Sequence, residues 1–430
     1  MKKIVAFFLC LLWTNLAQAA LSVDVSGAQT NPVPIAVTAF TGESNTLADI
    51  IKQDLESSGL FQIVPETAFL EEAGGIDAQP AFVNWQAIQV QALVQGTLTR
   101  QDNKWRIAFR MWDIFAEQEK TAKIVTIDEH NLRQGAHTVS DLIYQSITGE
   151  KGYFNTRIFY VAESGPAKKR IKKLAVMDLD GENMRYLTDG KSMVITPRVS
   201  PDMTSVAYLS YKKGKPRIYL MDLNTNTERL LGDFEGMTFA PRFSPDGKSL
   251  LLTQAKRGNS DIYLYNLESK EQTRLTTHSA IDTSPCFSPD GKKIVFSSDR
   301  SGTQQLYVMD ANGENAKRIS FGEKGNYATP VWSPRGDYIA FTKIQEGTFY
   351  IGVMRVDGSG ERLIAKGFLV EGPSWAPNGR ALMYFRQTPS SAYTDDGETG
   401  IYTINVTGHN ERRIKTPLNA SDPNWSGSLY

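Results

Sequence analysis

An internal repeat constrains this chain more than any other feature of its 430 residues. A turn phrase close to Ser-Pro-Asp-Gly recurs in steps of 44, 44, 45 and 43 residues, beginning at Ser200, Ser244, Ser288, Ser333 and Ala376. A strand phrase, typified by Leu-Tyr-Val-Met-Asp, recurs in steps of 44, 44, 44, 45 and 50 residues, beginning at Leu174, Ile218, Ile262, Leu306, Ile351 and Ile401. A fixed period of this length indicates repeated structural units that pack on one another.

Each unit carries four strand-like runs separated by turn residues. In the unit from Thr238 to Thr276 the runs are Phe239–Phe243, Ser249–Gln254, Asp261–Leu267 and Gln272–Thr276. The first turn, which begins at Ser244, suits a tight reversal because Pro fixes φ and Gly supplies a positive φ. No run shows the period of an amphipathic helix, which excludes helical solenoids. Four strands in a repeat of about 40–45 residues predict the blade of a β-propeller.

The count of the phrases predicts six blades and the way in which the ring closes. Six strand phrases are present, but the first unit, Thr156–Thr188, has no inner strand of its own. The segment Asp422–Gly427 resembles an inner strand that no blade follows. We therefore expect residues 151–430 to form a propeller in which the C-terminal strand completes the first blade, since an open ring would expose sheet edges.

Residues 35–150 lack the repeat and alternate between strand and helix patterns. Ile35–Phe40 is a predicted strand, residues 47–55 a helix that Gly59 ends, residues 92–115 a hairpin, and residues 132–147 a long amphipathic helix. The sequence thus predicts a mainly β protein, a six-bladed β-propeller preceded by a small α/β domain.

The first 20 residues have the pattern of a signal peptide. Lys2 and Lys3 precede an apolar run, Ile4–Trp13, that is too short to span a bilayer, and Ala17-Gln18-Ala19 has the small residues of a cleavage site. We expect cleavage after Ala19 or Ala20, and a buried helix or membrane anchor is the less favoured alternative. No later stretch is apolar enough to predict a membrane span. Residues 21–34 then form an extended, mobile or edge-strand arm with few apolar anchors.

The net charge limits the partners that the whole protein attracts, and the cysteine content limits the chemistry that it offers. Lys plus Arg and Asp plus Glu both number 47, so no net charge draws the whole protein to nucleic acid or lipid. Cys10 leaves with the signal, and Cys286 is more typical of a small core residue than of a nucleophile. The basic cluster Lys168–Lys173 is interpreted as a solvated loop, with a contact to an acidic partner or anionic lipid as the alternative.

We find no motif that predicts catalysis, a cofactor or a metal. A nucleophile elbow, an H-E-x-x-H motif, a cysteine pair and a glycine-rich phosphate loop are all missing from the sequence. His137 and Asp141 are four residues apart on what we take as the polar side of the last helix, where a surface or interdomain hydrogen bond is favoured over an acid–base pair. Asp178–Gly181 resembles a calcium loop less than an Asp-Gly hairpin turn.

Strand order predicts a binding face. The inner strand of each blade leads into the Ser-Pro-Asp-Gly turn, so the links between blades and the loops between second and third strands must lie on the opposite face. The residues that we assign to this face are Met237, Thr238, Phe239, His278, Asp282, Thr283, Arg300, Lys324, Asn326, Tyr327, Phe368 and Glu371. Aromatic and Arg residues with polar neighbours are typical of protein interfaces. The alternative is that they only line the solvated mouth of the channel.

The residues around the last helix carry a family resemblance. His137–Asp141, Ile147–Gly149, Gly152–Phe154 and Thr156–Ile158 resemble the TolB family, the periplasmic components of the Tol–Pal system, and the resemblance covers nearly the whole chain after the signal. Two departures are Met237–Phe239, where the family pattern is more polar, and the long stretch Gln387–Thr399.

The resemblance implies a function as an adaptor. It implies binding of the lipoprotein Pal by the propeller, and binding of TolA by the arm residues Leu21, Ser22, Val23, Asp24, Val25 and Ser26, in support of outer-membrane integrity and constriction during division. Other outer-membrane proteins are further candidate partners, and nucleic acid is not. The alternative function, the propeller of a peptidase-like hydrolase, is less favoured because we find no fused hydrolase domain and no candidate triad in residues 35–150.

Overall fold

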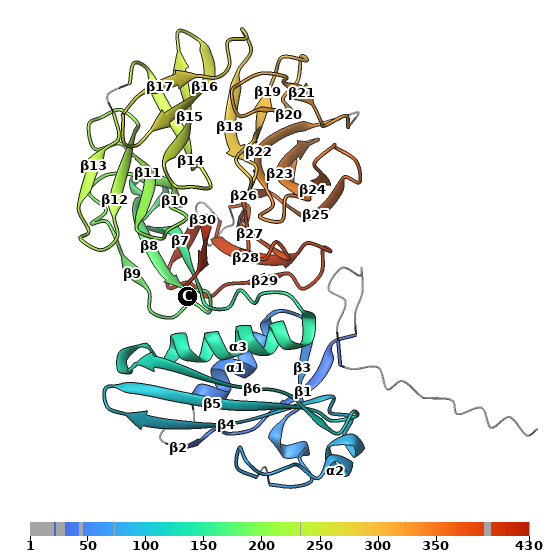
Figure 1. Ribbon diagram of the computed structural model, residues 1–430. Helices are drawn as coiled ribbons and strands as arrows, with labels where there is room; N and C mark the ends of the chain where they lie inside the picture. Colours follow the sequence, from blue (N-terminus) through green and yellow to red (C-terminus); the bar gives the residue numbers. More distant parts are fainter. Residues whose placement is uncertain are drawn as a thin grey trace, which may run out of the picture.

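The computed structural model describes residues 21–22, 31–42, 46–72, 74–232, 234–322, 324–390 and 397–429. The predicted signal peptide, its cleavage site, and the arm residues Val23, Asp24, Val25 and Ser26 lie outside these ranges. The described chain consists of a six-stranded mixed sheet with helices, followed by a ring of six four-stranded antiparallel sheets (Figure 1). The predicted fold class, a mainly β six-bladed propeller after a small α/β domain, is confirmed.

The blades are described from the channel outward. Blade 1 consists of β30 (Asn419–Ser428), β7 (Thr156–Ser164), β8 (Ile171–Asp178) and β9 (Arg185–Tyr186). Blade 2 consists of β10 (Val194–Val199), β11 (Ser205–Ser210), β12 (Arg217–Asp222) and β13 (Glu228–Leu230). Blade 3 consists of β14 (Met237–Phe243), β15 (Ser249–Lys256), β16 (Asn259–Asn266) and β17 (Gln272–Arg274). Blade 4 consists of β18 (Asp282–Phe287), β19 (Lys293–Ser298), β20 (Gln305–Asp310) and β21 (Lys317–Arg318). Blade 5 consists of β22 (Asn326–Trp332), β23 (Tyr338–Gln345), β24 (Thr348–Arg355) and β25 (Arg362–Gly367). Blade 6 consists of β26 (Leu369–Trp375), β27 (Ala381–Gln387), β28 (Thr399–Asn405) and β29 (Arg412–Arg413).

Blade 1 joins the two ends of the ring. Its inner strand, β30, contains Asp422–Gly427 and pairs antiparallel with β7, in a register that sets Trp425 opposite Ile158. The Trp425 indole is buried and donates a hydrogen bond to Thr156 Oγ1 at 2.9 Å. The last strand therefore covers an edge of β7 that would otherwise be open.

The repeated turn between first and second strands is held by its own side chains. In blade 3 the Ser244 hydroxyl donates to Asp246 Oδ1 at 2.5 Å, and the same oxygen accepts the Lys248 N–H at 3.0 Å. Gly247 has a φ of 72°, a conformation that an L residue with a Cβ adopts only under strain. The phrase recurs because each of its positions serves this one turn.

The N-terminal domain packs two helices on one side of its sheet. The sheet order is β3-β1-β4-β5-β6, and β2 pairs with β4. The bounds are β1 (Val33–Val37), β2 (Thr41–Gly42), β3 (Phe61–Ile63), β4 (Ala92–Gln101), β5 (Lys104–Asp113), β6 (Gln118–Asp128), α1 (Thr46–Ser57), α2 (Phe82–Ala87) and α3 (Leu132–Thr148), with short 3₁₀ helices η1 (Glu66–Ala68) and η2 (Glu129–Asn131). A third 3₁₀ helix, η3 (Ala167–Lys169), lies in the β7–β8 loop of blade 1. Figure 1 shows α3 between the sheet and the propeller.

Two sequence expectations for this domain need correction. The first strand begins at Val33 and ends at Val37, so it enters the predicted arm and ends before Phe40. The strand β6 and the helix α2 were not predicted. Most β6 side chains are exposed or half-buried, so the strand lacks the alternation of apolar residues on which the prediction relied.

One core runs through both parts of the protein. Buried residues of α1 and α3 belong to the same cluster as residues of blades 1 and 6. Tyr153, in the connection after α3, has T-shaped contacts with Tyr144 at 5.9 Å and with Trp425 at 5.6 Å between ring centroids. The closing strand is thus packed directly against the connection to the N-terminal domain.

Candidate functional site

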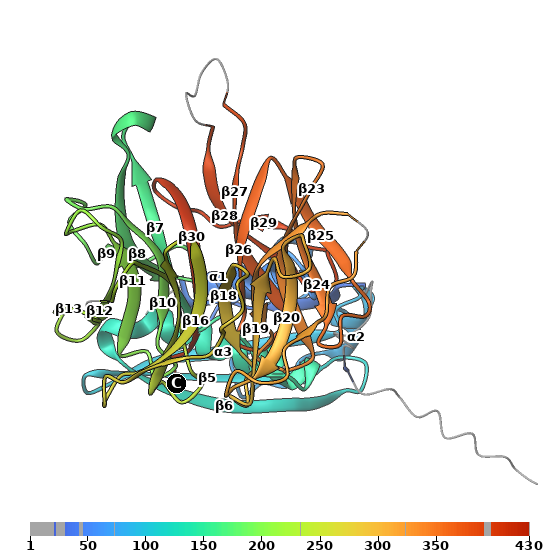
Figure 2. The same cartoon turned by 90° about the horizontal axis from the view of Figure 1, so that it is seen from above.

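The connections of the ring divide between two faces. The turn face carries the turns between first and second strands and between third and fourth strands. The loop face carries the links between blades, whose described residues are 187–193, 231–232, 234–236, 275–281, 319–322, 324–325, 368 and 414–418, and the loops between second and third strands. Figure 2 shows the β7–β8 loop at the upper end of the ring, and the N-terminal strands β5 and β6 at the lower end.

The N-terminal domain rests on the turn face. Glu150, just after α3, accepts hydrogen bonds from Arg335 Nη1 at 3.1 Å and from Arg380 Nε at 2.6 Å. Asn405 and Asn410 of blade 6 donate to the carbonyls at the end of α1 and just after it. All of these propeller residues lie in or beside the turns of the turn face, so the described part of the N-terminal domain contacts the turn face and not the loop face.

The predicted interface residues differ in their exposure. Met237, His278, Lys324, Asn326 and Phe368 are exposed, and Phe239, Thr283, Arg300 and Glu371 are half-buried. Thr238, Asp282 and Tyr327 are fully buried. The expectation that these last three side chains are presented to a partner is therefore corrected: they support the loops from inside, because the inner strands turn every second residue into the blade.

Asp282 and Arg300 form a closed pair. Arg300 Nη2 donates to both Asp282 oxygens, at 3.0 and 2.9 Å, and its Nε donates to Ser298 Oγ at 2.9 Å. The guanidinium also lies over the Tyr307 ring, 4.9 Å from the centroid. Arg300 is consequently held in one orientation, and its charge is already compensated.

A ring of exposed apolar side chains surrounds the loop face. Each of the six links places one large apolar residue in solvent, at or shortly before the start of the next inner strand. We call these residues the apolar ring; they are Met193, Met237, Ile281, Phe321, Phe368 and Leu418. Phe321 is 68% exposed and Phe368 is 58% exposed. Met237 and Phe368 were predicted from the sequence and the other four were not, although Met193, Ile281 and Leu418 share the position directly before an inner strand.

The channel opens into a cavity on this face. The cavity has a volume of about 430 Å³ and is lined by apolar residues that include Leu209, Met237 and Phe239, together with Arg198 and Arg242. Each inner strand contains a bulge at an X-Pro step whose first residue has a positive φ; these residues are Thr196, Ala240, Ser284, Thr329, Gly372 and Asp422. Each bulge bends its inner strand locally, next to the residue that follows the Pro.

Besides Asp282, two carboxyl groups, Glu371 and Asp422, and one thiol, Cys286, belong to the inner strands. Burial raises the pKa of Glu371, and the nearby Asp422 adds to the shift. Burial also raises the pKa of Asp422, against the opposing attraction of Lys172 and Arg198. Cys286 is half-buried; it contacts the cores of neighbouring blades and also lines the turn-face mouth of the channel, so its description as a core residue holds only in part.

A charged cluster lies buried between the two domains. His137 of α3 is 2% exposed; its Nδ1 lies 2.7 Å from Asp54 of α1, and its Nε2 lies 3.2 Å from Asp180 in the β8–β9 turn. Arg133 donates to the same Asp180 carboxylate at 2.7 Å. The favoured hypothesis, a surface or interdomain hydrogen bond, is only partly right: the hydrogen bond of His137 is to Asp54 within the N-terminal domain, and its contact across the domain boundary is an ion pair with Asp180. The placement of His137 on a polar helix side is wrong, since both His137 and Asp141 are buried.

The pKa shifts in this cluster follow from burial and charge. Burial alone would lower the pKa of His137, but Asp54 and Asp180 outweigh it and raise this pKa to about 10. Burial would raise the pKa of Asp180, yet His137 and Arg133 hold it below its usual range. For Asp54, burial exceeds the attraction of His137 and raises the pKa. One imidazolium and one guanidinium thus face two carboxylates.

The remaining sequence candidates lie in the connections. Asp141 accepts the Phe154 and Asn155 N–H groups at 2.7 and 3.2 Å, which fixes the connection to blade 1. Asp178–Gly181 forms the β8–β9 turn, closed by the Asp178 N–H to Glu182 O at 2.9 Å, as the hairpin interpretation predicts. Among the described residues, no group of three or more His, Cys, Asp or Glu side chains could hold a metal ion.

The basic cluster Lys168–Lys173 occupies the β7–β8 loop and the start of β8. Lys168 and Lys169 are exposed, whereas Lys172 lies 2.8 Å from Glu163 and Lys173 lies over the Tyr186 ring. The exposed charges therefore sit at the tip of the loop, on the loop face.

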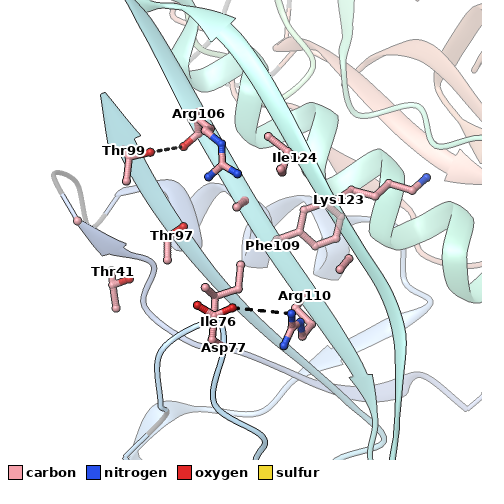
Figure 3. A pocket seen from close by; sticks show the side chains of 13 residues that line it. Thr41, Ile76, Asp77, Thr97, Thr99, Arg106, Phe109, Arg110, Lys123 and Ile124 are labelled. Carbon is pink, nitrogen blue, oxygen red and sulfur yellow. Dashed lines mark hydrogen bonds and ion pairs between the residues drawn. The ribbon is translucent and has the colours of Figure 1, made fainter. Parts of the chain in front are cut away.

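A separate hollow, of about 690 Å³, lies on the side of the N-terminal sheet that faces away from α1 and α3, the side on which α2 packs (Figure 3). Arg110 lies 3.9 Å from Asp77 and 3.0 Å from Glu119, while Arg106 and Lys123 flank the hollow. This surface is an open sheet face whose central arginine is already paired, and it brings together none of the residues predicted from the sequence.

The start of the arm is tied to the N-terminal domain. The Leu21 N–H donates to Asp113 Oδ2 at 2.9 Å, and Lys120 Nζ donates to the Leu21 carbonyl at 2.9 Å. The Leu21 side chain is buried in the core, while Ser22 is exposed. Leu21 is thus an apolar anchor that the sequence analysis did not recognise.

The chain is similar to known proteins over nearly its whole length. The family model of the TolB amino-terminal domain matches residues 21–120, and that of the TolB beta propeller domain matches residues 144–429. The Tol-Pal system protein TolB of Paramagnetospirillum magneticum is 54% identical over 418 residues, which cover 95% of this chain and 93% of that protein. The crystal structure of TolB from Acinetobacter baumannii has a TM-score of 0.83 at 29% identity and covers 93% of this chain and 97% of that one. Within the described part of the chain, no helix is long and apolar enough to cross a membrane.

Proposed function

The chain belongs to the TolB family of Tol-Pal system proteins, and from this premise we propose that it is a periplasmic adaptor that binds Pal through the loop face of its propeller and TolA through its N-terminal arm. In this role it supports outer-membrane integrity and constriction during cell division. The mature protein begins after Ala19 or Ala20, once the signal peptide is removed.

The observation that carries the proposal is the contrast between the two faces of the propeller. The turn face is engaged by the N-terminal domain, whereas the loop face has a central cavity inside the apolar ring. Exposed apolar side chains grouped around a hollow mark a surface that a partner covers. An interface of this kind has a few dominant contacts at its centre and weaker ones at its rim.

The anchors of the proposed Pal interface are the accessible members of the predicted set. Met237 and Phe368 are exposed, and Phe239 and Thr283 lie closer to the channel and are half-buried. The buried Asp282 fixes Arg300 beside them, so the surface is preorganised and loses little entropy on binding.

The arm is the proposed site for TolA. Its residues are Leu21, Ser22, Val23, Asp24, Val25 and Ser26, of which the structure describes the first two. An extended segment can add as a strand to the sheet edge of a partner, with affinity from backbone hydrogen bonds and specificity from alternate side chains. The contact of Leu21 with Asp113 implies that TolA competes with an internal attachment of the arm.

We propose an adaptor rather than an enzyme. His137, the histidine with two carboxylate neighbours, is closed off between the domains, where a substrate cannot approach it. The peptidase-like alternative requires a nucleophile within reach of a base, and no described cluster offers that arrangement. The domain division is proposed as residues 21–34 for the arm, 35–150 for the α/β domain and 151–430 for the propeller.

A calorimetric titration with the soluble domain of Pal tests the proposal. Phe239→Ala or Thr283→Arg should weaken binding by about 1–3 kcal/mol, the range of a single interface anchor, with little change in Tm. The matched controls are Lys248→Glu and Lys292→Glu, exposed positions in turns of the turn face, which should leave the affinity unchanged. If the controls lose Pal and the loop-face variants keep it, the assignment of the face is wrong.

A further inference from the structure

Two arginines meet in the channel wall between blades 2 and 3. Each inner strand has an X-Pro bulge, and the residues that follow the six prolines are Arg198, Arg242, Cys286, Val331, Ser374 and Asn424. Arg198 lies in β10 and Arg242 in β14, the inner strands of neighbouring blades (Figure 1). The repeat therefore places two cations side by side at equivalent positions of the ring.

Neither guanidinium has an ionic partner within the described chain. Arg198 Nη1 donates to the carbonyl of Pro197 at 2.6 Å, and no hydrogen bond or ion pair joins Arg242 to any described residue. Burial lowers the pKa of Arg198, and the charge of Arg242 adds to that shift. Burial also lowers the pKa of Arg242. Both residues are half-buried in the channel wall, and arginine remains protonated in proteins, so two neighbouring cations that lack an ionic partner favour an anion or water that meets them.

The charges that face this pair do not neutralise it. Asp422, in the inner strand of the adjoining blade 1, attracts Arg198 but, among the described residues, forms no ion pair with either arginine. Burial raises the pKa of Asp422 and of Glu371, so both carboxyl groups are disfavoured in their charged forms. The wall at blades 2 and 3 is accordingly a positive site.

Both arginines line the loop-face cavity of about 430 Å³, whose walls include Leu209, Tyr211, Met237 and Phe239. They also line another hollow, of about 420 Å³, at the turn-face mouth of the channel. They therefore lie between the two mouths, and a group that enters from the loop face passes apolar walls before it reaches them. A cavity with apolar walls and cationic side chains at its inner end suits a carboxylate on a short apolar side chain.

We propose that Arg198 and Arg242 form a carboxylate-binding site, and that its occupant is an acidic side chain of the protein that docks on the loop face. This inference rests on the proposed function and adds to it the chemistry of the central contact. A guanidinium offers paired N–H donors that match a carboxylate, and a charge pair closed off from water by surrounding contacts is the usual form of a polar hot spot. The apolar ring supplies those surrounding contacts.

A calorimetric titration of the mature chain with the soluble domain of Pal tests the inference. Arg242→Met and Arg198→Met should each weaken binding by roughly tenfold or more, because each removes one of the two cations that face the partner's carboxylate. Their Tm should be unchanged or higher, since an apolar side chain of similar length removes a half-buried charge that has no ionic partner. Arg242→Lys, which keeps the charge and loses the paired donors, should fall between wild type and Arg242→Met. The matched control, Lys256→Met, removes an exposed loop-face cation that pairs with Glu235 outside the cavity, and should change the affinity by less than about twofold.

Replacement of the acidic residues of Pal by their amides, one at a time, identifies the occupant. One of these Pal substitutions should weaken binding to the wild-type chain, and it should not weaken binding to the Arg242→Met variant any further. If wild type binds Pal and Arg242→Met binds as tightly, the inference is overturned while the proposed function stands. If wild type does not bind Pal, the proposed function fails and the inference fails with it. A loss of binding accompanied by a fall in Tm assigns the arginines a structural role instead. A Tm increase with inorganic phosphate that requires Arg242, combined with unchanged Pal affinity, indicates a free-anion site and also overturns the inference.

Discussion

Raising the pH from 7 to 9 should loosen the attachment of the N-terminal domain to the propeller. His137 is held between Asp54 and Asp180 from opposite sides of the domain boundary, and its pKa is raised from 6.5 to about 10. A group whose pKa is higher in the folded state stabilises that state fully below its unfolded pKa and loses the contribution as the pH rises toward the folded value. The affected window is therefore pH 6.5 to about 10.

The size of the effect follows from the same shift. Within the window each pH unit removes about 1.4 kcal/mol from the free energy of unfolding, so the change between pH 7 and pH 9 amounts to about 3 kcal/mol. Without its proton the imidazole leaves Arg133 as the remaining cation beside the two buried carboxylates. Urea unfolding at several pH values, followed by the fluorescence of Trp85, Trp105 and Trp112 in the N-terminal domain, measures the loss.

The matched variant is His137→Gln, which keeps a donor for Asp54 and cannot titrate. It should be less stable than wild type at pH 7, and its stability should change little between pH 7 and pH 9. If wild type and variant show the same dependence on pH, the loss does not come from His137 and the account of the cluster is refuted.

Three further predictions concern the ring, the sheet and the arm. Deletion of Asp422–Tyr430 should lower the Tm of the whole propeller and cause self-association, because it uncovers the edge of β7; a monomer with the wild-type Tm in calorimetry and gel filtration would show that β30 does not close the ring. Gly96→Ala should destabilise the N-terminal domain by about 1–3 kcal/mol, because the new Cβ would lie 2.1 Å from Phe40 Cε1, whereas Gly75→Ala, with no atom within 4 Å, should be neutral in the same urea titration. Removal of residues 21–32 should abolish TolA binding in calorimetry and leave the circular dichroism spectrum unchanged; retained binding would place the TolA site elsewhere.

The repeat made the propeller predictable from the sequence because each turn phrase contains the groups that form its own turn. Ser244, Asp246 and Gly247 act on each other within four residues, so spacing alone revealed the blade boundaries. The strand β6 escaped prediction for the opposite reason. Its side chains are mostly polar and exposed, and it is held by backbone pairing with β5, which leaves no periodic pattern in the sequence.

The sequence predicted which face of the propeller carries the candidate site, but it did not predict which side chains that face exposes. Strand order placed the links between blades on the loop face, but the burial of Thr238 and Tyr327 depends on how the start of each inner strand turns its residues into the blade. The partners of His137 could not be predicted from the sequence, because one of them, Asp180, belongs to a different domain. Arg198 and Arg242 can be recognised as a pair only in the structure, where the bulges of the inner strands are arranged around the channel.

The orientation of the propeller on its partner is the central claim, and site-specific photo-crosslinking in living cells tests it most directly. A benzophenone side chain placed at Met237 or Phe368 on the loop face should form a covalent adduct with Pal. The same group at Lys248 or Lys292, in the turns of the opposite face, should form none. Adducts with Pal from Lys248 and Lys292, together with their absence from Met237 and Phe368, would contradict the account.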